Sequence, residues 1–203
     1  MYGHLELKMS SSSKYSEWRG GSSRSAQPEI DFTSPGLAVM EVERLLFSGK
    51  AINSAADEVW PKLYIGDMNI AENLAELRKH HFTHILNCAQ SSRRGGEIYD
   101  GMGITYMGIE AEDQPSFDMS AHFKTAVEFI HTALKGGGKI LVHCHVGVSR
   151  SATIVLAYLM LKHNMTLVDS INTVKEGRGV IPNRGFLRQL IDLHIKLYGY
   201  RNK

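Results

Sequence analysis

The sequence predicts an α/β domain whose central, mainly parallel sheet has about five strands and is flanked by helices. Three observations predict this fold. Short apolar runs alternate with segments of helical periodicity between residues 58 and 143, as in parallel sheets. Only helical patterns follow residue 150. Between the two parts, a short apolar run enters a helix through a glycine-containing loop, and open α/β sheets bind ligands beyond such strand ends.

The first half of the domain carries a helix and four of the strands. Ser34-Pro35-Gly36 is a helix start signal, and apolar residues then recur at helical spacing until Gly49. Residues 58–66 predict two short strands with a turn between them, because Pro61 does not suit a central strand. The rest of this half comprises a helical pattern at 67–81, a strand at 82–87 and a strand at 104–109.

The second half begins with a helix expected over residues 119–134. Three glycines end this helix, and a buried strand at 139–143, the loop and three helices follow. Thr166 with Asp169 is a capping pair for the second of these helices, and Asn183 is a good cap for the third.

The composition suits one domain with a tail. The chain has 203 residues, 43% of them hydrophobic, which is enough for a single core. Residues 1–33 are expected to form a disordered Ser/Gly-rich tail, because they lack periodic apolar positions, and residues 34–203 form the domain. The formal net charge of +2 favours binding to neither nucleic acid nor membranes. No apolar run approaches the roughly 20 residues of a membrane span.

The two cysteines, Cys88 and Cys144, are too few for a disulfide framework. A reactive thiol needs a reducing compartment, so we expect a soluble intracellular protein in the cytoplasm, the nucleus or both. The histidines are scattered and no carboxylate cluster has ligand spacing. We therefore expect neither a metal nor another cofactor.

Residues 143–151, between the last strand and a helix, are His-Cys-His-Val-Gly-Val-Ser-Arg-Ser. A helix N-terminus binds anions through free N–H groups and a partial positive charge, and the same field stabilises a thiolate. The Arg150 guanidinium can bind two phosphate oxygens, and Gly147 lets the backbone approach an anion. The segment predicts phosphoryl transfer to Cys144, with a buried structural cysteine beside a capping arginine as the alternative.

This loop resembles the His-Cys-(any five)-Arg-Ser signature of the cysteine-based protein tyrosine phosphatases. Residues 149–153 and 157–160 resemble the dual-specificity branch, and the segments at 58–66, 83–87 and 182–187 occur in the order typical of that branch. The resemblance covers roughly residues 37–200 and is closest to the small atypical dual-specificity phosphatases, including the muscle and testis members. It implies a protein phosphatase that needs no metal.

The resemblance also implies roles for individual residues. Cys144 attacks the phosphorus, Ser151 donates a hydrogen bond to the leaving thiolate, and His143 lowers the thiol pKa through its hydrogen bonds. The phosphate oxygens are bound by loop N–H groups and the Arg150 guanidinium. The substrate-binding residues of the loop are His145, Val146, Gly147, Val148, Ser149 and Arg150.

The leaving oxygen needs a proton, so a carboxylic acid is expected on a nearby loop. The candidates after the strand at 104–109 are Glu110, Glu112, Asp113 and Asp118. Asp113 occupies the position of the family's general acid, and we expect it to protonate the leaving group and then to activate water. Without the resemblance, Asp113 is equally a loop turn residue, and Asp118 has the place of a helix cap.

Two residues depart from the family pattern. Protonated His145, directly after the nucleophile, would add positive charge beside the thiolate; an exposed side chain that points away is the alternative. Cys88 follows the strand at 82–87, where many relatives have Ala. It is a possible redox partner that forms a reversible disulfide with Cys144, or else a buried small apolar residue.

The resemblance implies phosphoprotein substrates. The loop has no Lys, unlike that of inositide phosphatases, and no tyrosine-bearing recognition segment precedes the sheet. A shallow pocket should therefore admit phosphoserine, phosphothreonine and phosphotyrosine. Mitogen-activated protein kinases are a family-level expectation, as is a monomer or weak homodimer. The alternatives are a phosphatase-fold protein that binds phosphoproteins with little turnover, and an RNA 5′-phosphatase, for which no basic groove with stacking aromatics is evident.

Overall fold

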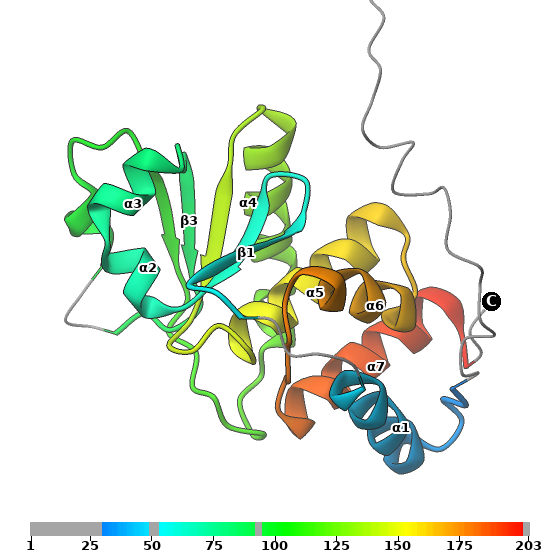
Figure 1. The fold of residues 1–203 in the computed structure, drawn as a ribbon. Helices are drawn as coiled ribbons and strands as arrows, with labels where there is room; N and C mark the ends of the chain where they lie inside the picture. Colours follow the sequence, from blue (N-terminus) through cyan, green and yellow to red (C-terminus); the bar gives the residue numbers. More distant parts are fainter. Residues whose placement is uncertain (1–29, 49–52, 92–94, 201–203) are drawn as a thin grey trace, which may run out of the picture.

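The computed structural model of the chain describes residues 30–48, 53–91 and 95–200. Five strands form one mixed sheet in the order β1-β2-β5-β3-β4 (Figure 1). The strands are β1 (Ala56–Trp60), β2 (Leu63–Gly66), β3 (His84–Asn87), β4 (Thr105–Gly108) and β5 (Ile140–His143). β1 runs antiparallel to β2, and the other three neighbouring pairs are parallel. The predicted α/β fold with a mainly parallel sheet is confirmed.

Helices cover the sheet, and a helical cluster lies beside it. The α-helices of the described residues are α1 (Pro35–Phe47), α2 (Met68–Glu72), α3 (Leu74–Lys79), α4 (Phe123–Lys135), α5 (Arg150–His163), α6 (Leu167–Gly177) and α7 (Arg184–Tyr198). α5, α6 and α7 pack together, and α1 lies against α6 and α7 (Figure 1). None of the described helices is long and apolar enough to cross a bilayer.

The sheet separates two apolar layers, because successive side chains of a strand point to opposite faces. Leu86 and Val142 belong to the larger core, together with buried residues of α4 and α5. Ile85 and Leu141, one position earlier in each strand, pack with α2 and α3. All four side chains are fully buried, so β3 and β5 form the centre of the molecule.

The helical pattern at 67–81 forms two helices instead of one. The Asp67 side chain accepts a hydrogen bond from the Ile70 N–H at 3.0 Å and begins α2. Asn73 accepts from the Glu76 N–H at 3.2 Å and begins α3. Asn73 ends the first helix because its side chain accepts the hydrogen bond that a backbone carbonyl would accept in a continuous helix.

The domain begins earlier than the predicted boundary at residue 34. Ile30 and Phe32 are buried in the larger core, and the Phe32 ring lies 4.2 Å from that of buried His194, between centroids. Residues 30–33 therefore belong to the domain, although two apolar residues in a polar stretch produce no periodic signal. The remaining tail prediction concerns residues 1–29, which lie outside the described residues.

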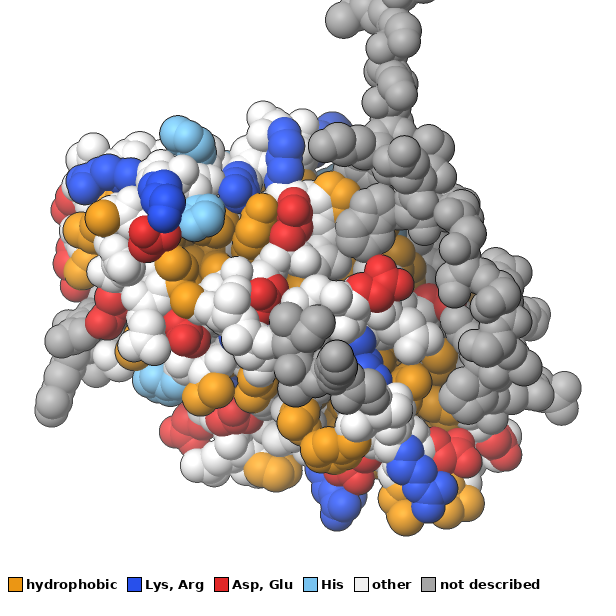
Figure 2. Space-filling model, viewed as in Figure 1, with side chains coloured by type: hydrophobic (Ala, Val, Ile, Leu, Met, Phe, Trp, Pro, Cys, Tyr) orange, Lys and Arg blue, Asp and Glu red, His pale blue; other side chains and the backbone are white. Residues whose placement is uncertain are grey.

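α1 has one buried and one exposed side. Val39 and Val42 enter the core, whereas Leu37, Met40 and Phe47 remain exposed. Apolar side chains accordingly gather over α1 at the bottom of Figure 2, and basic and acidic side chains are interspersed over the rest of that face.

The topology places the carboxyl ends of three strands together. His143 at the end of β5 pairs with Gly66 of β2 on one side and with Asn87 of β3 on the other. The loop from Cys144 to Ser149 leaves this central strand and enters α5, so it lies where an open α/β sheet binds its ligand.

Candidate active site

The loop between β5 and α5, here called the signature loop (residues 143–150), depends on Gly147 for its curvature. Gly147 has φ of +76°, and a Cβ there would lie 2.4 Å from the Gly66 carbonyl oxygen. The left-handed backbone and the close approach both exclude a side chain. Since α5 begins at Arg150, the loop lies at the amino end of a 14-residue helix, an arrangement that binds anions.

Cys144 is buried at the base of the signature loop. Its Sγ accepts a hydrogen bond from the Gly147 N–H at 3.2 Å and lies 3.3 Å from the Ser151 Oγ. Burial acts to raise the pKa of the thiol, but hydrogen bonds from Ser151 and Gly147, with the charge of Arg150, outweigh burial and lower the pKa. These groups therefore stabilise the thiolate form of Cys144, which is the nucleophilic form of cysteine.

Arg150 connects the signature loop to the segment that carries the candidate acids. Its Nη1 donates to the Ala111 carbonyl oxygen at 2.9 Å, and its Nε lies 3.8 Å from the Asp113 Oδ2. Within the described residues, this buried Nε makes no hydrogen bond. A fixed guanidinium with a donor to spare beside the thiolate can bind an anionic oxygen.

Asp113 reaches the signature loop because two groups donate to one of its oxygens. Oδ1 accepts hydrogen bonds from the Ser149 Oγ at 2.7 Å and from the Asn183 Nδ2 at 2.9 Å. Oδ2 faces Arg150, and 37% of the side chain is exposed. The structure thus brings Asp113, Arg150 and Cys144 together at one end of the sheet.

The other acidic candidates have different surroundings. Asp118 accepts hydrogen bonds from the Ser120 hydroxyl and the Ala121 N–H, so its carboxylate is engaged in the turn that precedes α4. Glu112 is exposed and lines a neighbouring cavity. Among the described residues, no group of three or more His, Cys, Asp or Glu side chains could hold a metal ion.

Asn183 is a site residue that the sequence analysis treated only as a helix cap. The cap is confirmed, since its Oδ1 accepts from the Phe186 N–H at 3.0 Å. The same side chain also donates to Asp113, and the Asn183 N–H donates to the Ser149 Oγ at 3.2 Å. The contact with Asp113 joins positions 70 residues apart, which no local pattern reveals.

His143 lies at the end of β5, and its ring is buried. By geometry neither ring nitrogen has a hydrogen-bond partner among the described residues, and its predicted effect on the thiol pKa stays a prediction. Burial lowers the pKa of His143 to about 4, against the opposing effects of the Cys144 backbone and Asp67. A neutral imidazole therefore fills the space behind the signature loop.

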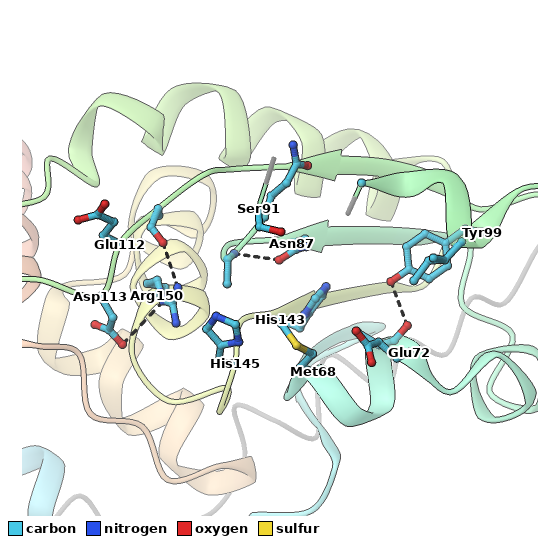
Figure 3. Close-up of a pocket in the computed structure, with 16 residues that line it drawn as sticks. Met68, Glu72, Asn87, Ser91, Tyr99, Glu112, Asp113, His143, His145 and Arg150 are labelled. Atoms are coloured by element: carbon cyan, nitrogen blue, oxygen red, sulfur yellow. Dashed lines mark hydrogen bonds and ion pairs between the residues drawn. The ribbon is translucent and has the colours of Figure 1, made fainter. Parts of the chain in front are cut away.

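His145 is exposed on the wall of a cavity of about 570 Å³ beside the signature loop. Figure 3 shows its imidazole between Arg150 and His143. Asp113 and Glu112 line the same cavity. The side chain thus lines the same cavity as the candidate acid.

Cys88 lies directly after β3 and is fully buried. Its N–H donates to the His143 carbonyl oxygen at 2.8 Å, which places it beside the end of β5. Burial, followed by the proximity of Cys144, raises the pKa of the Cys88 thiol well above its ordinary value. Both cysteines are free thiols in this structure.

The five-stranded α/β fold, and the signature loop that carries Cys144 and Arg150 at its strand ends, are features of a known protein family. The dual specificity phosphatase catalytic domain model matches residues 63–196, and the chain therefore belongs to the dual-specificity phosphatases. It is a phosphoric monoester hydrolase that acts on phosphotyrosine and phosphoserine or phosphothreonine, and its substrates are phosphoproteins.

Individual relatives agree with this assignment. Rat dual specificity protein phosphatase 26 is 56% identical over 192 residues, which cover 94% of this chain and 90% of the relative. Human DUSP28 has the same fold, with a TM-score of 0.64 and 27% identity, over 73% of this chain and 99% of that one. A human tyrosine phosphatase-like serine/threonine/tyrosine-interacting protein also matches, at TM-score 0.59 and 30% identity, over 70% and 96% of the two chains.

Proposed function

We propose that catalysis proceeds through a thiophosphate on Cys144. The thiolate attacks phosphorus in line, the Sγ–P bond forms, and the bond from phosphorus to the leaving oxygen breaks. Water then attacks the thiophosphate, the Sγ–P bond breaks, and inorganic phosphate leaves as the thiolate re-forms. The observation that carries this proposal is the buried Cys144, with a lowered pKa, inside a loop that leads into the N-terminus of α5.

Asp113 is the proposed proton donor of the first step and the base of the second. Its Oδ1 already accepts two hydrogen bonds, whereas Oδ2 faces the Arg150 Nε at 3.8 Å. We therefore assign proton transfer to Oδ2. This oxygen donates a proton to the leaving group as the P–O bond breaks, and it takes a proton from the attacking water in the second step.

The negative charge of the transferring phosphoryl group is bound by the signature loop. The N–H groups of residues 145–150 and the Arg150 guanidinium are the proposed donors, since the guanidinium is fixed by Ala111 and retains a buried donor. Ser151 lies 3.3 Å from the Cys144 Sγ and is proposed to donate to the thiolate as it leaves. His145 is proposed to add positive charge at the cavity wall when it is protonated.

The test is hydrolysis of p-nitrophenyl phosphate in the presence of a chelator. We expect the wild type to turn over, Cys144→Ser to be inactive, and Asp113→Asn to lose roughly 100-fold or more in kcat. Reduced, folded wild type that binds phosphoproteins without any turnover would support the binding-protein alternative. Full activity of Cys144→Ser would refute the thiophosphate.

Substrates and context are proposed at the family level. Mitogen-activated protein kinases are candidate substrates, the cytoplasm and nucleus are the proposed compartments, and a monomer or weak homodimer is the proposed state. Dephosphorylation of a doubly phosphorylated activation-loop peptide tests the substrate. If enzyme that hydrolyses p-nitrophenyl phosphate releases phosphate from neither residue of that peptide, mitogen-activated protein kinases are excluded as substrates.

A further inference from the structure

Arg178 is among the largest fully buried side chains of the described structure, and the mechanism above does not use it. It directly follows α6 and is 2% exposed. Its guanidinium makes an ion pair with Asp57 of β1 at 2.6 Å. Burying a charge at this depth is costly unless the guanidinium has several partners, so the identity of those partners indicates its role.

Two of the partners are backbone carbonyl groups of the signature loop. The Arg178 Nε donates to the Gly147 carbonyl oxygen at 2.8 Å, and the Nη2 donates to the Val146 carbonyl oxygen at 3.3 Å. The Nη1 binds Asp57 and, at 2.8 Å, the Ser54 carbonyl oxygen. One rigid fork therefore connects two consecutive peptide groups of the loop to the edge of the sheet.

The contact between Arg178 and the loop affects the Cys144 thiol through the geometry of the trans peptide group. The C=O and N–H of one peptide group point in opposite directions. The Val146 carbonyl that Arg178 binds shares its peptide group with the Gly147 N–H, and this N–H donates to the Cys144 Sγ at 3.2 Å. In the next peptide group, Arg178 binds the Gly147 carbonyl, which turns the Val148 N–H away from Arg178.

We propose that Arg178 is a positioning residue that aims the N–H groups of the signature loop at the thiolate and at the phosphoryl oxygens. Its positive charge at the carbonyl ends also polarises these peptide groups, so their N–H ends become stronger donors. This inference rests on Cys144 being the nucleophile. It adds that a residue without contact to the reacting atoms determines how well the loop stabilises their charge.

Asp57 of β1 holds the Arg178 guanidinium in place. Besides Arg178, its carboxylate accepts hydrogen bonds from the Ser54 N–H and hydroxyl group. Asp57→Asn removes the negative charge that pairs with Arg178, whereas the Ser54 hydroxyl can donate to the Ala56 carbonyl oxygen and accept from the new NH₂. The variant therefore loosens Arg178 without removing any group from the signature loop.

The experiment compares Arg178→Lys and Asp57→Asn with two matched controls. Arg184→Lys changes an exposed arginine that pairs with Glu43, and Glu58→Gln removes a carboxylate next to Asp57 that does not contact Arg178. The first readout is the rate of Cys144 alkylation by iodoacetamide as a function of pH, which requires no turnover. The second is inhibition by inorganic phosphate, and thermal unfolding is measured in parallel.

We expect Arg178→Lys to slow alkylation at about pH 6 roughly tenfold, with its midpoint shifted to higher pH, because the loop N–H groups are then aimed less well at the thiolate. Phosphate should inhibit roughly tenfold less well, and Asp57→Asn should show the same changes at about threefold. Both controls should match the wild type. Added guanidinium should change the alkylation rate of Arg178→Ala more than that of wild type, and this difference would give independent support.

Unchanged alkylation profiles and phosphate inhibition in Arg178→Lys and Asp57→Asn, with only a lower melting temperature, would show that Arg178 merely supports the fold and would overturn the proposal. If Arg178→Ala does not fold, the Lys and Asn variants decide. Failure of the proposed catalytic role is distinguishable, because it would appear as an active Cys144→Ser enzyme whatever the alkylation profiles show.

Discussion

Asn183→Ser should weaken the general acid while keeping the helix that Asn183 caps. The hydroxyl group of Ser can still accept from the Phe186 N–H at the start of α7. It carries no amide to reach the Asp113 Oδ1, which Asn183 contacts at 2.9 Å. The substitution therefore separates the cap from the contact with the acid.

The size of the effect follows from the exposure of Asp113. A hydrogen bond to a charged group contributes about 1.5–3 kcal/mol when it is buried. Since 37% of the Asp113 side chain is exposed, water replaces part of the lost bond, and about 1 kcal/mol is the expected loss. This energy corresponds to about a fivefold change in rate.

The assay is kcat/KM, which reports on cleavage of the P–O bond, with two substrates. Phenyl phosphate has a poor leaving group that needs the acid, whereas p-nitrophenyl phosphate leaves more easily. We expect Asn183→Ser to lower kcat/KM about fivefold for phenyl phosphate and less than about twofold for p-nitrophenyl phosphate. In an Asp113→Asn background, the same substitution should have almost no effect.

Equal losses on both substrates would refute this reasoning, as would a full fivefold loss in the Asp113→Asn background. Either result would mean that Asn183 acts through the shape of the loop and not through the acid. Thermal unfolding of Asn183→Ser and of Asn183→Asp, which also retains a cap, controls for the stability of α7.

Three further predictions concern the cysteines and histidines. Cys88 should protect Cys144 through a reversible disulfide. After treatment with peroxide and then with thiol, Cys88→Ser should therefore recover clearly less activity than wild type, and equal recovery would contradict the prediction. Mass spectrometry of the oxidised wild type checks for the linked peptides. His143 has a pKa lowered to about 4, below that of an unfolded histidine, so the unfolded chain binds the extra proton first. The free energy of unfolding should therefore include about 3 kcal/mol from the neutral ring above about pH 6.5, and this amount should be lost as the pH falls towards 4. In urea unfolding, the stability of His143→Gln should depend less on acid pH than that of wild type. An equal dependence would contradict the assignment. His145→Ala should lower kcat/KM about threefold on the acid side of the pH–rate profile, whereas an unchanged pH–rate curve would exclude a role for its charge.

The local patterns of the sequence determined the signature loop and most of the fold. A nucleophilic Cys144, an Arg150 at the first turn of a helix and a glycine between them are close in the chain, so sequence spacing defines their geometry. The strands were equally predictable, because short apolar runs bounded by polar loops have few other structures available. The helical pattern at 67–81 forms two helices because a capping side chain, Asn73, interrupts it.

Contacts between distant segments were decided only by the tertiary structure. Ile30 and Phe32 join the core, although nothing periodic marks them. Asp113 was placed by resemblance, but only the fold shows that Asn183 holds its Oδ1 and leaves Oδ2 toward Arg150. Only the fold likewise shows that the His143 ring is buried, with no geometric hydrogen-bond partner for its nitrogens among the described residues.

Arg178 shows the physical reason for this division. A chemical group can be assigned from sequence when its partners lie within a few residues, since the backbone then fixes their separation. The signature-loop carbonyl groups that Arg178 binds lie 31 and 32 residues away, and Asp57 lies 121 residues away. The sequence by itself predicted which atoms carry out the chemistry, and the packing of α6 and β1 around the signature loop decided how those atoms are held.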